Sequence, residues 1–144
     1  MSTTSRVIIV EDDPHTLSGY VEFLTAAGFE PIGAPNGAEA LPIALGNPPA
    51  AVVTDITLPG MNGFELAAAL RADSRTRSIP IIGLTAHWTA DVHARARDVA
   101  MQVVLSKPCL PAHLVAELNR VLGRAKAPDD VGATSVLRAH TVPS

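Results

Sequence analysis

Five short apolar runs recur along the chain, and polar or turn-forming residues close each of them. The runs cover residues 6–10, 30–34, 50–55, 79–85 and 102–106, and the second is the weakest. A continuous apolar run of this length is typical of a strand that is covered on both faces. The pattern therefore predicts five short, mostly buried strands.

Segments with helical spacing of apolar residues follow each strand. We expect helices from Pro14 to a stop at Gly28, and over residues 37–45, 63–73, 89–100 and 111–124. Pro42 lies inside the second of these, so that helix should start late, kink or split. Five strands that alternate with five helices favour an α/β fold, a doubly wound parallel sheet with helices on both faces.

The chain of 144 residues suits one domain of ordinary size. We place this domain at residues 1–124. Residues 125–144 lack apolar periodicity, and we interpret them as a C-terminal tail, flexible or docked, that forms no separate domain. We expect no effector domain after residue 124, so the chain would act by binding other proteins or together with a domain outside it.

Composition narrows the classes of function. Hydrophobic residues make up 47% of the chain, which predicts a packed globule and excludes global disorder. The net charge is −3 and no dense Lys/Arg run occurs, so direct nucleic-acid binding is not expected.

Cys109 is the only cysteine, which excludes an internal disulfide. The N-terminus carries too short an apolar run for a signal peptide or a membrane span, and we expect a cytoplasmic protein with no membrane partner.

Candidate chemistry gathers where the predicted strands end. Glu11 and Asp12 follow the first strand, Asp55 ends the third, Thr85 ends the fourth, and Lys107 follows the fifth. In a doubly wound sheet the carboxyl ends of the strands form one rim, where ligands bind. Clustered carboxylates repel one another unless a cation joins them, and a site with few oxygen ligands suits Mg²⁺. A carboxylate can also accept a phosphoryl group, for which a nearby lysine and hydroxyl are suited.

Each of these residues also has a simpler interpretation. The acids after the first strand could cap a helix, and Asp13 fits that role best. Asp55 could cap a loop, Thr85 could satisfy backbone groups at a strand end, and Lys107 could be an ordinary solvated lysine. The convergence of all these side chains on one rim favours a functional site over these separate roles.

The chain resembles the receiver domain of two-component response regulators from Val7 to about Gly123. The resemblance rests on four elements in the right order and at suitable spacing: Glu11-Asp12, D-x-x-L-P-G-M-N-G (55–63), L-T-A (84–86) and S-K-P (106–108). It implies a flavodoxin-like (βα)5 sheet with strand order 2-1-3-4-5.

The resemblance also implies a metal site. Asp12 and Asp55 would bind Mg²⁺, with Mn²⁺ as an alternative ion. The backbone carbonyl of Thr57 would be a further ligand, and Glu11 would act through water or from behind the direct ligands.

For phosphoryl transfer, the resemblance implies that Asp55 accepts the group from a phosphohistidine. Thr85 would bond a phosphoryl oxygen, Ala86 would leave room for it, and Lys107 would pair with its charge. The peptide bond before Pro108 is usually cis in this family. His87 lies two residues after Thr85, where the family places residues that tune the access of water.

The chain departs from the family in the parts that report phosphorylation. Val104 stands where many receivers carry an aromatic switch residue, and Cys109 stands where phenylalanine is frequent. The usual turn before the fifth strand is replaced by residues 99–101. We therefore hypothesise that phosphorylation is read differently, through the loop after Thr85.

The leading interpretation is a signalling phosphoacceptor, not an enzyme in the ordinary sense, that changes its protein binding when phosphorylated. Its donor would be a histidine kinase or a histidine phosphotransfer protein, and its downstream protein partner is open. One alternative is a phosphorelay carrier or phosphate sink. A second is a pseudo-receiver that binds partners without phosphate. The sequence leaves open whether the chain stands alone or derives from a hybrid kinase.

Overall fold

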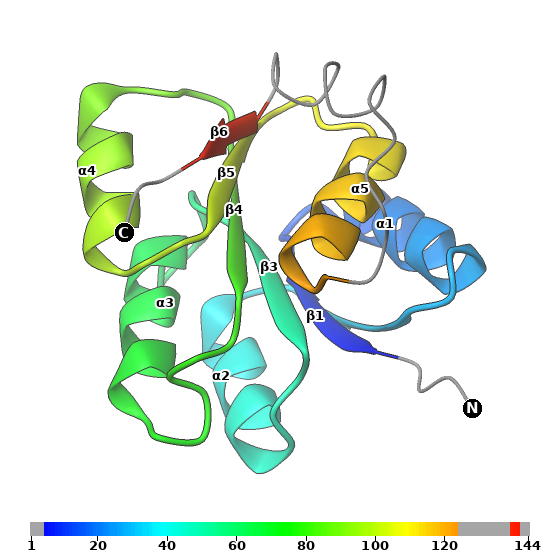
Figure 1. The fold of residues 1–144 in the computed structure, drawn as a ribbon, viewed down its shortest axis with the longest axis horizontal. Helices are drawn as coiled ribbons and strands as arrows, with labels where there is room; N and C mark the ends of the chain where they lie inside the picture. Colours follow the sequence, from blue (N-terminus) through cyan, green and yellow to red (C-terminus); the bar gives the residue numbers. More distant parts are fainter. Residues whose placement is uncertain (1–4, 124–138, 142–144) are drawn as a thin grey trace.

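The computed structural model describes residues 5–123 and 139–141, which form one sheet with helices on both sides (Figure 1). The parallel strands are β1 (Arg6–Val10), β2 (Glu30–Ala34), β3 (Ala51–Asp55), β4 (Ile81–Thr85) and β5 (Val103–Ser106). The helices are α1 (Pro14–Ala26), α2 (Gly37–Gly46), α3 (Gly63–Ala72), α4 (Ala90–Asp98) and α5 (Pro111–Val121). The order β2-β1-β3-β4-β5 confirms the predicted fold.

Two apolar cores lie on opposite faces of the sheet. Ile8 and Val10 of β1 belong to the core that α2, α3 and α4 cover, whereas Val7 and Ile9 belong to the core that α1 and α5 cover. All four side chains have no exposed surface. This explains the unbroken apolar run of β1, because alternate residues of a strand point to opposite faces and here both faces are buried.

Side-chain caps fix where four of the helices begin, among them α4, where the Thr89 hydroxyl accepts from the backbone N–H of Val92. The carboxylate of Asp13 accepts a hydrogen bond from the backbone N–H of Thr16, and Asn36 caps α2 in the same way. Asn62 and Glu65 form a reciprocal capping box at the start of α3. These bonds satisfy N–H groups that have no partner inside the helix, so each helix starts at a defined point of the loop from its strand. Asp13 therefore has the capping role proposed for it from the sequence.

The expectation that Pro42 delays or splits its helix is wrong. α2 runs as one helix from Gly37 to Gly46 with Pro42 inside it. Proline removes one hydrogen bond of the helix, but Ala40 and Ala44 on either side of it are buried in the core. Packing of this apolar face holds the helix together where propensity alone would not.

A sixth strand, which the sequence analysis did not predict, extends the sheet. β6 (Ala139–Thr141) lies antiparallel beside β5 and falls within the segment interpreted as a tail. The sequence of residues 139–141 is too short and too polar to predict a strand by itself. The rest of that segment, residues 125–138 and 142–144, lies outside the described residues, as does residue 124, and the predicted domain boundary stays a prediction.

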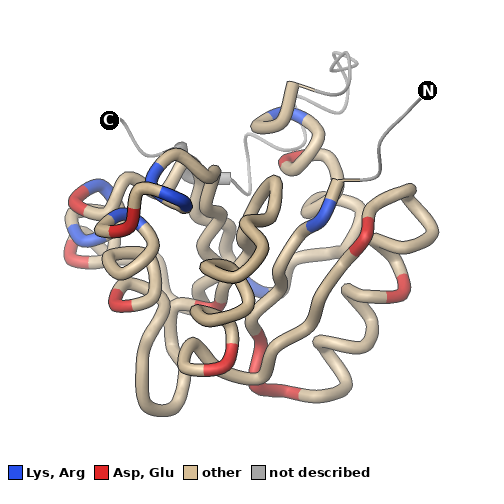
Figure 2. Tube along the Cα trace, turned by 90° about the horizontal axis from the view of Figure 1, so that it is seen from below, with Lys and Arg blue, Asp and Glu red and all other residues tan. Residues whose placement is uncertain are grey.

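Acidic and basic residues both occur at many positions along the described part of the chain (Figure 2). Within residues 5–123 and 139–141, no helix is both long enough and apolar enough to cross a membrane.

Candidate functional site

The register of the sheet brings the candidate residues to one rim. Val10 of β1 pairs with Thr54 of the adjacent strand β3. The residues that follow them, Glu11 and Asp55, therefore lie side by side. On the other side, the backbone N–H of Lys107 donates to the carbonyl of Thr85 at 2.7 Å. Because all these strands are parallel, the residues at their carboxyl ends converge, as expected from the sequence.

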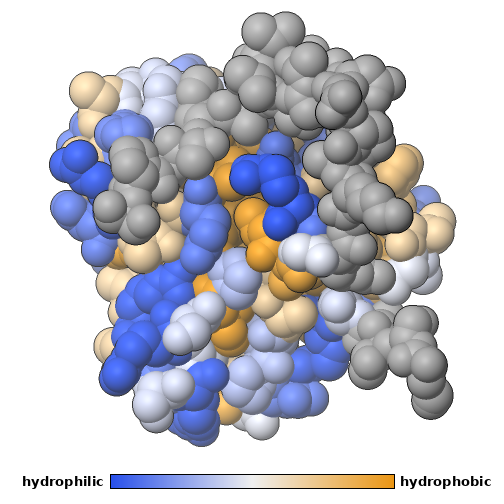
Figure 3. All heavy atoms as spheres, in the orientation of Figure 1, coloured by the Kyte–Doolittle hydropathy of each residue, from blue (hydrophilic) through white to orange (hydrophobic). Residues whose placement is uncertain are grey.

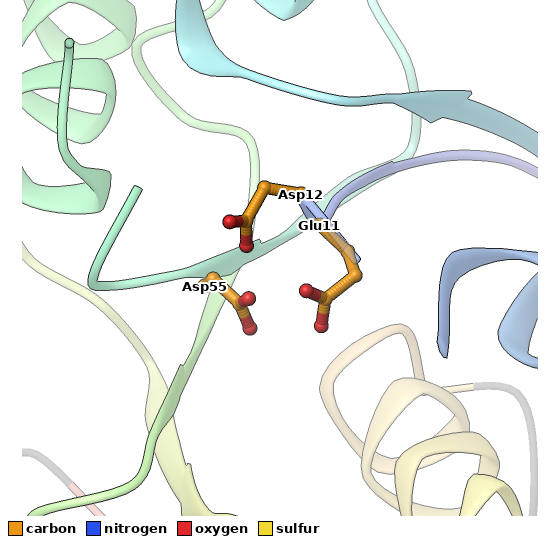
Figure 4. A group of neighbouring side chains, drawn as sticks. All are labelled: Glu11, Asp12 and Asp55. Carbon is orange, nitrogen blue, oxygen red and sulfur yellow. The ribbon is translucent and has the colours of Figure 1, made fainter. Parts of the chain in front are cut away.

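Three carboxylates form the centre of the rim (Figure 4). Glu11, Asp12 and Asp55 each offer an oxygen, and these oxygens lie within 4.8 Å of one another. Glu11 and Asp55 are only 1% and 3% exposed, whereas Asp12 is exposed to solvent. The cluster therefore has a buried floor and an open side.

Lys107 binds both buried carboxylates. Its Nζ donates to Oε1 of Glu11 at 3.1 Å and to Oδ1 and Oδ2 of Asp55 at 3.2 and 3.3 Å. The second oxygen of Glu11 accepts from the backbone N–H of Asp13 at 3.0 Å. A single ammonium thus balances two buried carboxylates, which leaves the cluster with excess negative charge.

This imbalance of charge, together with burial, shifts the pKa values of Asp55, Glu11 and Lys107. Burial, and after it the carboxylate of Glu11, raise the pKa of Asp55 to about 7 against the opposing effect of Lys107. Burial also acts to raise the pKa of Glu11, but hydrogen bonds from Asp55, from the Asp13 backbone and from Lys107 outweigh it, and the pKa falls. Burial alone would lower the pKa of Lys107, yet the two carboxylates raise it. Asp55 therefore holds a proton more readily than an ordinary aspartate, and an added cation would displace that proton.

The donor set fits a magnesium ion. All three side chains supply carboxylate oxygens, and Mg²⁺ prefers oxygen ligands from one or two carboxylates together with water. The exposed position of Asp12 leaves the open side to water or to a phosphate oxygen. Residues of this rim could hold the metal and present Asp55 beside it.

Thr85 lies at the rim, but its hydroxyl is engaged locally. Its Oγ1 accepts from the backbone N–H of His87 and donates to the His87 carbonyl, each at 3.1 Å. Thr85 is 5% exposed, whereas Ala86 and His87 are exposed in the loop that follows β4. To reach a group on Asp55, the Thr85 hydroxyl must leave these two backbone bonds.

The other candidate residues surround this centre. Thr57 is exposed in the loop two residues after Asp55. The bond between Lys107 and Pro108 is cis, as the resemblance implied. Val104 is fully buried in the core on the α3 and α4 side, so an apolar side chain occupies the position of the family's aromatic switch.

The sequence analysis included Gly63 in the motif 55–63 but gave it no role; this glycine is the first residue of α3. A Cβ atom at this position would lie 2.4 Å from the carbonyl oxygen of Asp55 and 2.9 Å from Cα of Ile56. The N–H of Gly63 also donates to the Ile56 carbonyl at 2.9 Å. The start of α3 therefore rests directly on the backbone of Asp55, which only glycine permits. A glycine at the first helical position, where it has no propensity advantage, was the available signal.

Comparisons with known proteins agree with this geometry. The family model of the response regulator receiver domain matches residues 7–119. The transcriptional regulatory protein PrrA of Mycobacterium tuberculosis is 33% identical over 140 residues, which cover 97% of this chain and 57% of PrrA. The polar-differentiation response regulator DivK of Brucella ovis is 31% identical over 122 residues, 85% of this chain and 99% of DivK. The chain thus spans little more than half of PrrA but nearly all of DivK.

Solved structures give the same result. The chemotaxis response regulator CheY4 of Vibrio cholerae matches with a TM-score of 0.78 at 30% identity, over 83% of this chain and 99% of CheY4. The receiver domain of the sensor histidine kinase PA1611 from Pseudomonas aeruginosa matches with a TM-score of 0.77 at 26% identity, over 84% of this chain and 99% of that domain. The latter structure contains a magnesium ion coordinated in its active-site cleft.

Proposed function

Because the chain belongs to the response regulator receiver domain family, we propose that Asp55 is its phosphoacceptor and that phosphorylation requires Mg²⁺. One observation carries the proposal: a buried carboxylate, Asp55, lies between two further acids and the ammonium of Lys107. Capping or solvation would not require this combination, whereas phosphoryl transfer uses each part of it.

In the proposed reaction, an oxygen of the ionised Asp55 attacks the phosphorus of a phosphohistidine on a partner protein. A new P–O bond forms, the P–N bond to the imidazole breaks, and the electron pair stays on the departing nitrogen. Asp12, Asp55 and the Thr57 carbonyl would hold Mg²⁺ directly, and Glu11 would act on the ion through water or from behind these ligands. When bound, the ion neutralises charge on the phosphoryl oxygens and keeps Asp55 ionised.

Lys107 and Thr85 then act on the transferred group. The ammonium of Lys107, which bonds both oxygens of Asp55, exchanges one of them for a phosphoryl oxygen. The Thr85 hydroxyl turns from the His87 backbone toward another phosphoryl oxygen, which frees the loop that begins at Ala86. In this proposal the loop after Thr85 transmits the phosphorylation signal. Val104 cannot do so by changing rotamer as an aromatic switch residue would, because it has no aromatic side chain.

The proposed donor is a histidine kinase or a histidine phosphotransfer protein, and the proposed output is altered binding of another protein. The cytoplasmic location expected from the sequence is part of this proposal. The same chemistry serves a relay carrier or phosphate sink, and the lifetime of the phosphoryl group distinguishes the two. A switch keeps the group longer than its encounter with the partner, whereas a sink loses it quickly.

Intact-protein mass spectrometry after incubation with acetyl phosphate tests the proposal. We expect a gain of one phosphoryl group with Mg²⁺ present, no gain with EDTA, and no gain for Asp55→Asn. Asp98→Asn, a change of the same chemistry at an exposed position on α4, is the matched control and should be phosphorylated normally. If Asp55→Asn accepted phosphate as readily as this control, Asp55 would not be the acceptor.

A further inference from the structure

The outer edge of β5 carries a strand from the same chain. β6 runs antiparallel to β5, with Val103 opposite Thr141, Val104 opposite His140 and Leu105 opposite Ala139. β5 is the last strand of the parallel sheet, so its second edge would otherwise present unpaired backbone groups (Figure 1). Such an edge is a site at which another strand can add.

The hydrogen bonds of β5 indicate which of its residues face β6. The N–H of Gln102 donates to the carbonyl of Ile81 next to β4. Backbone groups of a strand alternate in direction, so those of Val104 also face β4, and those of Val103 and Leu105 face outward. Ala139 and Thr141 therefore supply the ladder to β5, while the backbone groups of His140 point away from it.

The connection between α5 and β6 allows the strand to come from the same molecule. Fifteen residues, 124–138, separate the described end of the α5 region from Ala139. An extended segment of this length reaches about 50 Å, several times the length of a four-residue strand. An antiparallel strand that starts beside Leu105 is thus within reach of the end of α5.

The outer edge of β5 lies close in sequence to the residues of the candidate site. Leu105, opposite Ala139, lies two residues before Lys107, and Ser106 between them pairs with Thr85. Hydrophobic surface is visible between β5 and α5 on this face, interrupted by strongly hydrophilic side chains (Figure 3). A segment that pairs with β5 would therefore have apolar surface beside it for its own side chains.

We propose that residues 139–141 are an autoinhibitory strand: they occupy the outer edge of β5 and compete there with an extended segment of a partner protein. Backbone pairing would give the partner its affinity, and the apolar surface between β5 and α5 would favour hydrophobic side chains. A three-residue strand makes few ladder bonds, so it opens more readily than the core strands and can be displaced. The proposal does not depend on phosphorylation of Asp55.

Amide hydrogen exchange of the full chain, followed by NMR without Mg²⁺ or phosphate, tests the occupation of the edge. In the double variant Ala139→Pro/Thr141→Pro, which removes both ladder donors of β6, we expect the amides of Val103 and Leu105 to exchange at least about tenfold faster. The amide of Val104, which faces β4, should not change. His140→Pro is the matched control, since the same residue is introduced where the N–H points away from β5, and it should retain the protection of the unmodified chain.

Equal exchange of Val103 and Leu105 in the unmodified chain and the double variant would overturn the proposal, as would equal loss of protection in the double variant and His140→Pro. Protection that rises with protein concentration, together with a dimer in sedimentation, would place the strand in a second copy and would also contradict it.

Competition is tested with a synthetic peptide of residues 136–144. We expect the peptide to shift the Val103 and Leu105 amide signals of the double variant at a concentration at least about tenfold lower than for the unmodified chain. Equal affinity for both proteins, or no shift in either, would show that the edge does not exchange strands and would overturn the competition.

Discussion

At the residue scale, the chemistry of the site depends on how the carboxyl group of Asp55 is held between like and opposite charge. Burial raises the pKa of Asp55 most, the carboxylate of Glu11 raises it further, and Lys107 lowers it without offsetting these two effects. The site is therefore destabilised by its own negative charge, and this repulsion should be relieved by a cation or by removal of one carboxylate.

Replacement of Asp55 by asparagine should stabilise the metal-free protein at neutral pH. The pKa of Asp55 rises from 3.8 to about 7 on folding, so its contribution to stability is present below pH 3.8 and is lost as the pH rises through 7. Relative to Asp55→Asn, the unmodified chain should lose on the order of 4 kcal/mol of unfolding free energy between pH 4 and pH 8. Urea unfolding of both proteins over this pH range measures the difference. A constant difference would show that Asp55 has an ordinary pKa.

Gly63 should tolerate no side chain. In Gly63→Ala the new Cβ would meet the Asp55 carbonyl oxygen, whose position fixes the carboxylate. We expect a loss of about 1–3 kcal/mol of unfolding free energy and weaker binding of Mg²⁺.

The matched control is Gly19→Ala, because a Cβ at this position within α1 meets nothing within 4 Å. That change should stabilise the protein by up to about 1 kcal/mol, since alanine favours a helix over glycine. Chemical denaturation of both variants checks the pair. Equal effects would mean that the start of α3 adapts and does not hold Asp55 in place.

At the element scale, strands and helices that follow from the periodicity of apolar residues could be predicted from the sequence. Elements that depend on tertiary contacts could not. The run at residues 6–10 predicted β1 because both faces of that strand are buried. The rim residues could be found because parallel strands bring their ends together. β6 could not be predicted, since three residues gain their strand conformation only from the edge of β5. The effect of Pro42 could not be predicted for a similar reason, because packing of α2 against the core outweighs the local cost of proline.

Arg71, in the last turn of α3, joins two loops that the sequence analysis did not connect. Its guanidinium donates to the carbonyls of Arg77 and Ile79 before β4, at 2.6 and 2.7 Å. It also donates to the carbonyls of Val99 and Ala100 before β5, at 3.0 and 2.8 Å. Ala100 has a φ of 57°, a conformation that favours glycine and that these bonds help to hold.

Arg71→Ala should therefore destabilise the protein by about 3 kcal/mol, because four carbonyl groups lose a charged donor. Arg75→Ala is the matched control, since its pairing with Asp73 is exposed and its loss should destabilise the protein much less than Arg71→Ala. Urea denaturation of both variants gives the comparison. A small effect at Arg71 would show that the two loops hold their shape without it.

At the scale of the whole molecule, the metal site should be coupled to global stability. The three carboxylates come from β3 and from the loop after β1, so only the folded chain brings them together. At a Mg²⁺ concentration of 100 times its dissociation constant, we expect about 2.7 kcal/mol of added stability. This corresponds to a rise in melting temperature of roughly 5–10 °C.

Thermal unfolding with and without Mg²⁺ measures this effect. Asp12→Asn should lose most of the shift, whereas Glu22→Gln, at an exposed position on α1, should keep it. A shift of equal size in Asp12→Asn and Glu22→Gln would mean that Mg²⁺ stabilises the protein elsewhere.

The central claim is that the phosphoryl group forms on Asp55, and chemical identification of the modified residue tests it most directly. Borohydride reduces an acyl phosphate on aspartate to homoserine, which marks the residue permanently. After phosphorylation with acetyl phosphate and Mg²⁺, reduction and digestion, fragmentation of the peptide Val7–Arg71 should locate homoserine at position 55. The same peptide contains Glu11 and Asp12, so the competing carboxylates are read in one spectrum. A reduced residue at position 11 or 12, with Asp55 unchanged, would contradict the account.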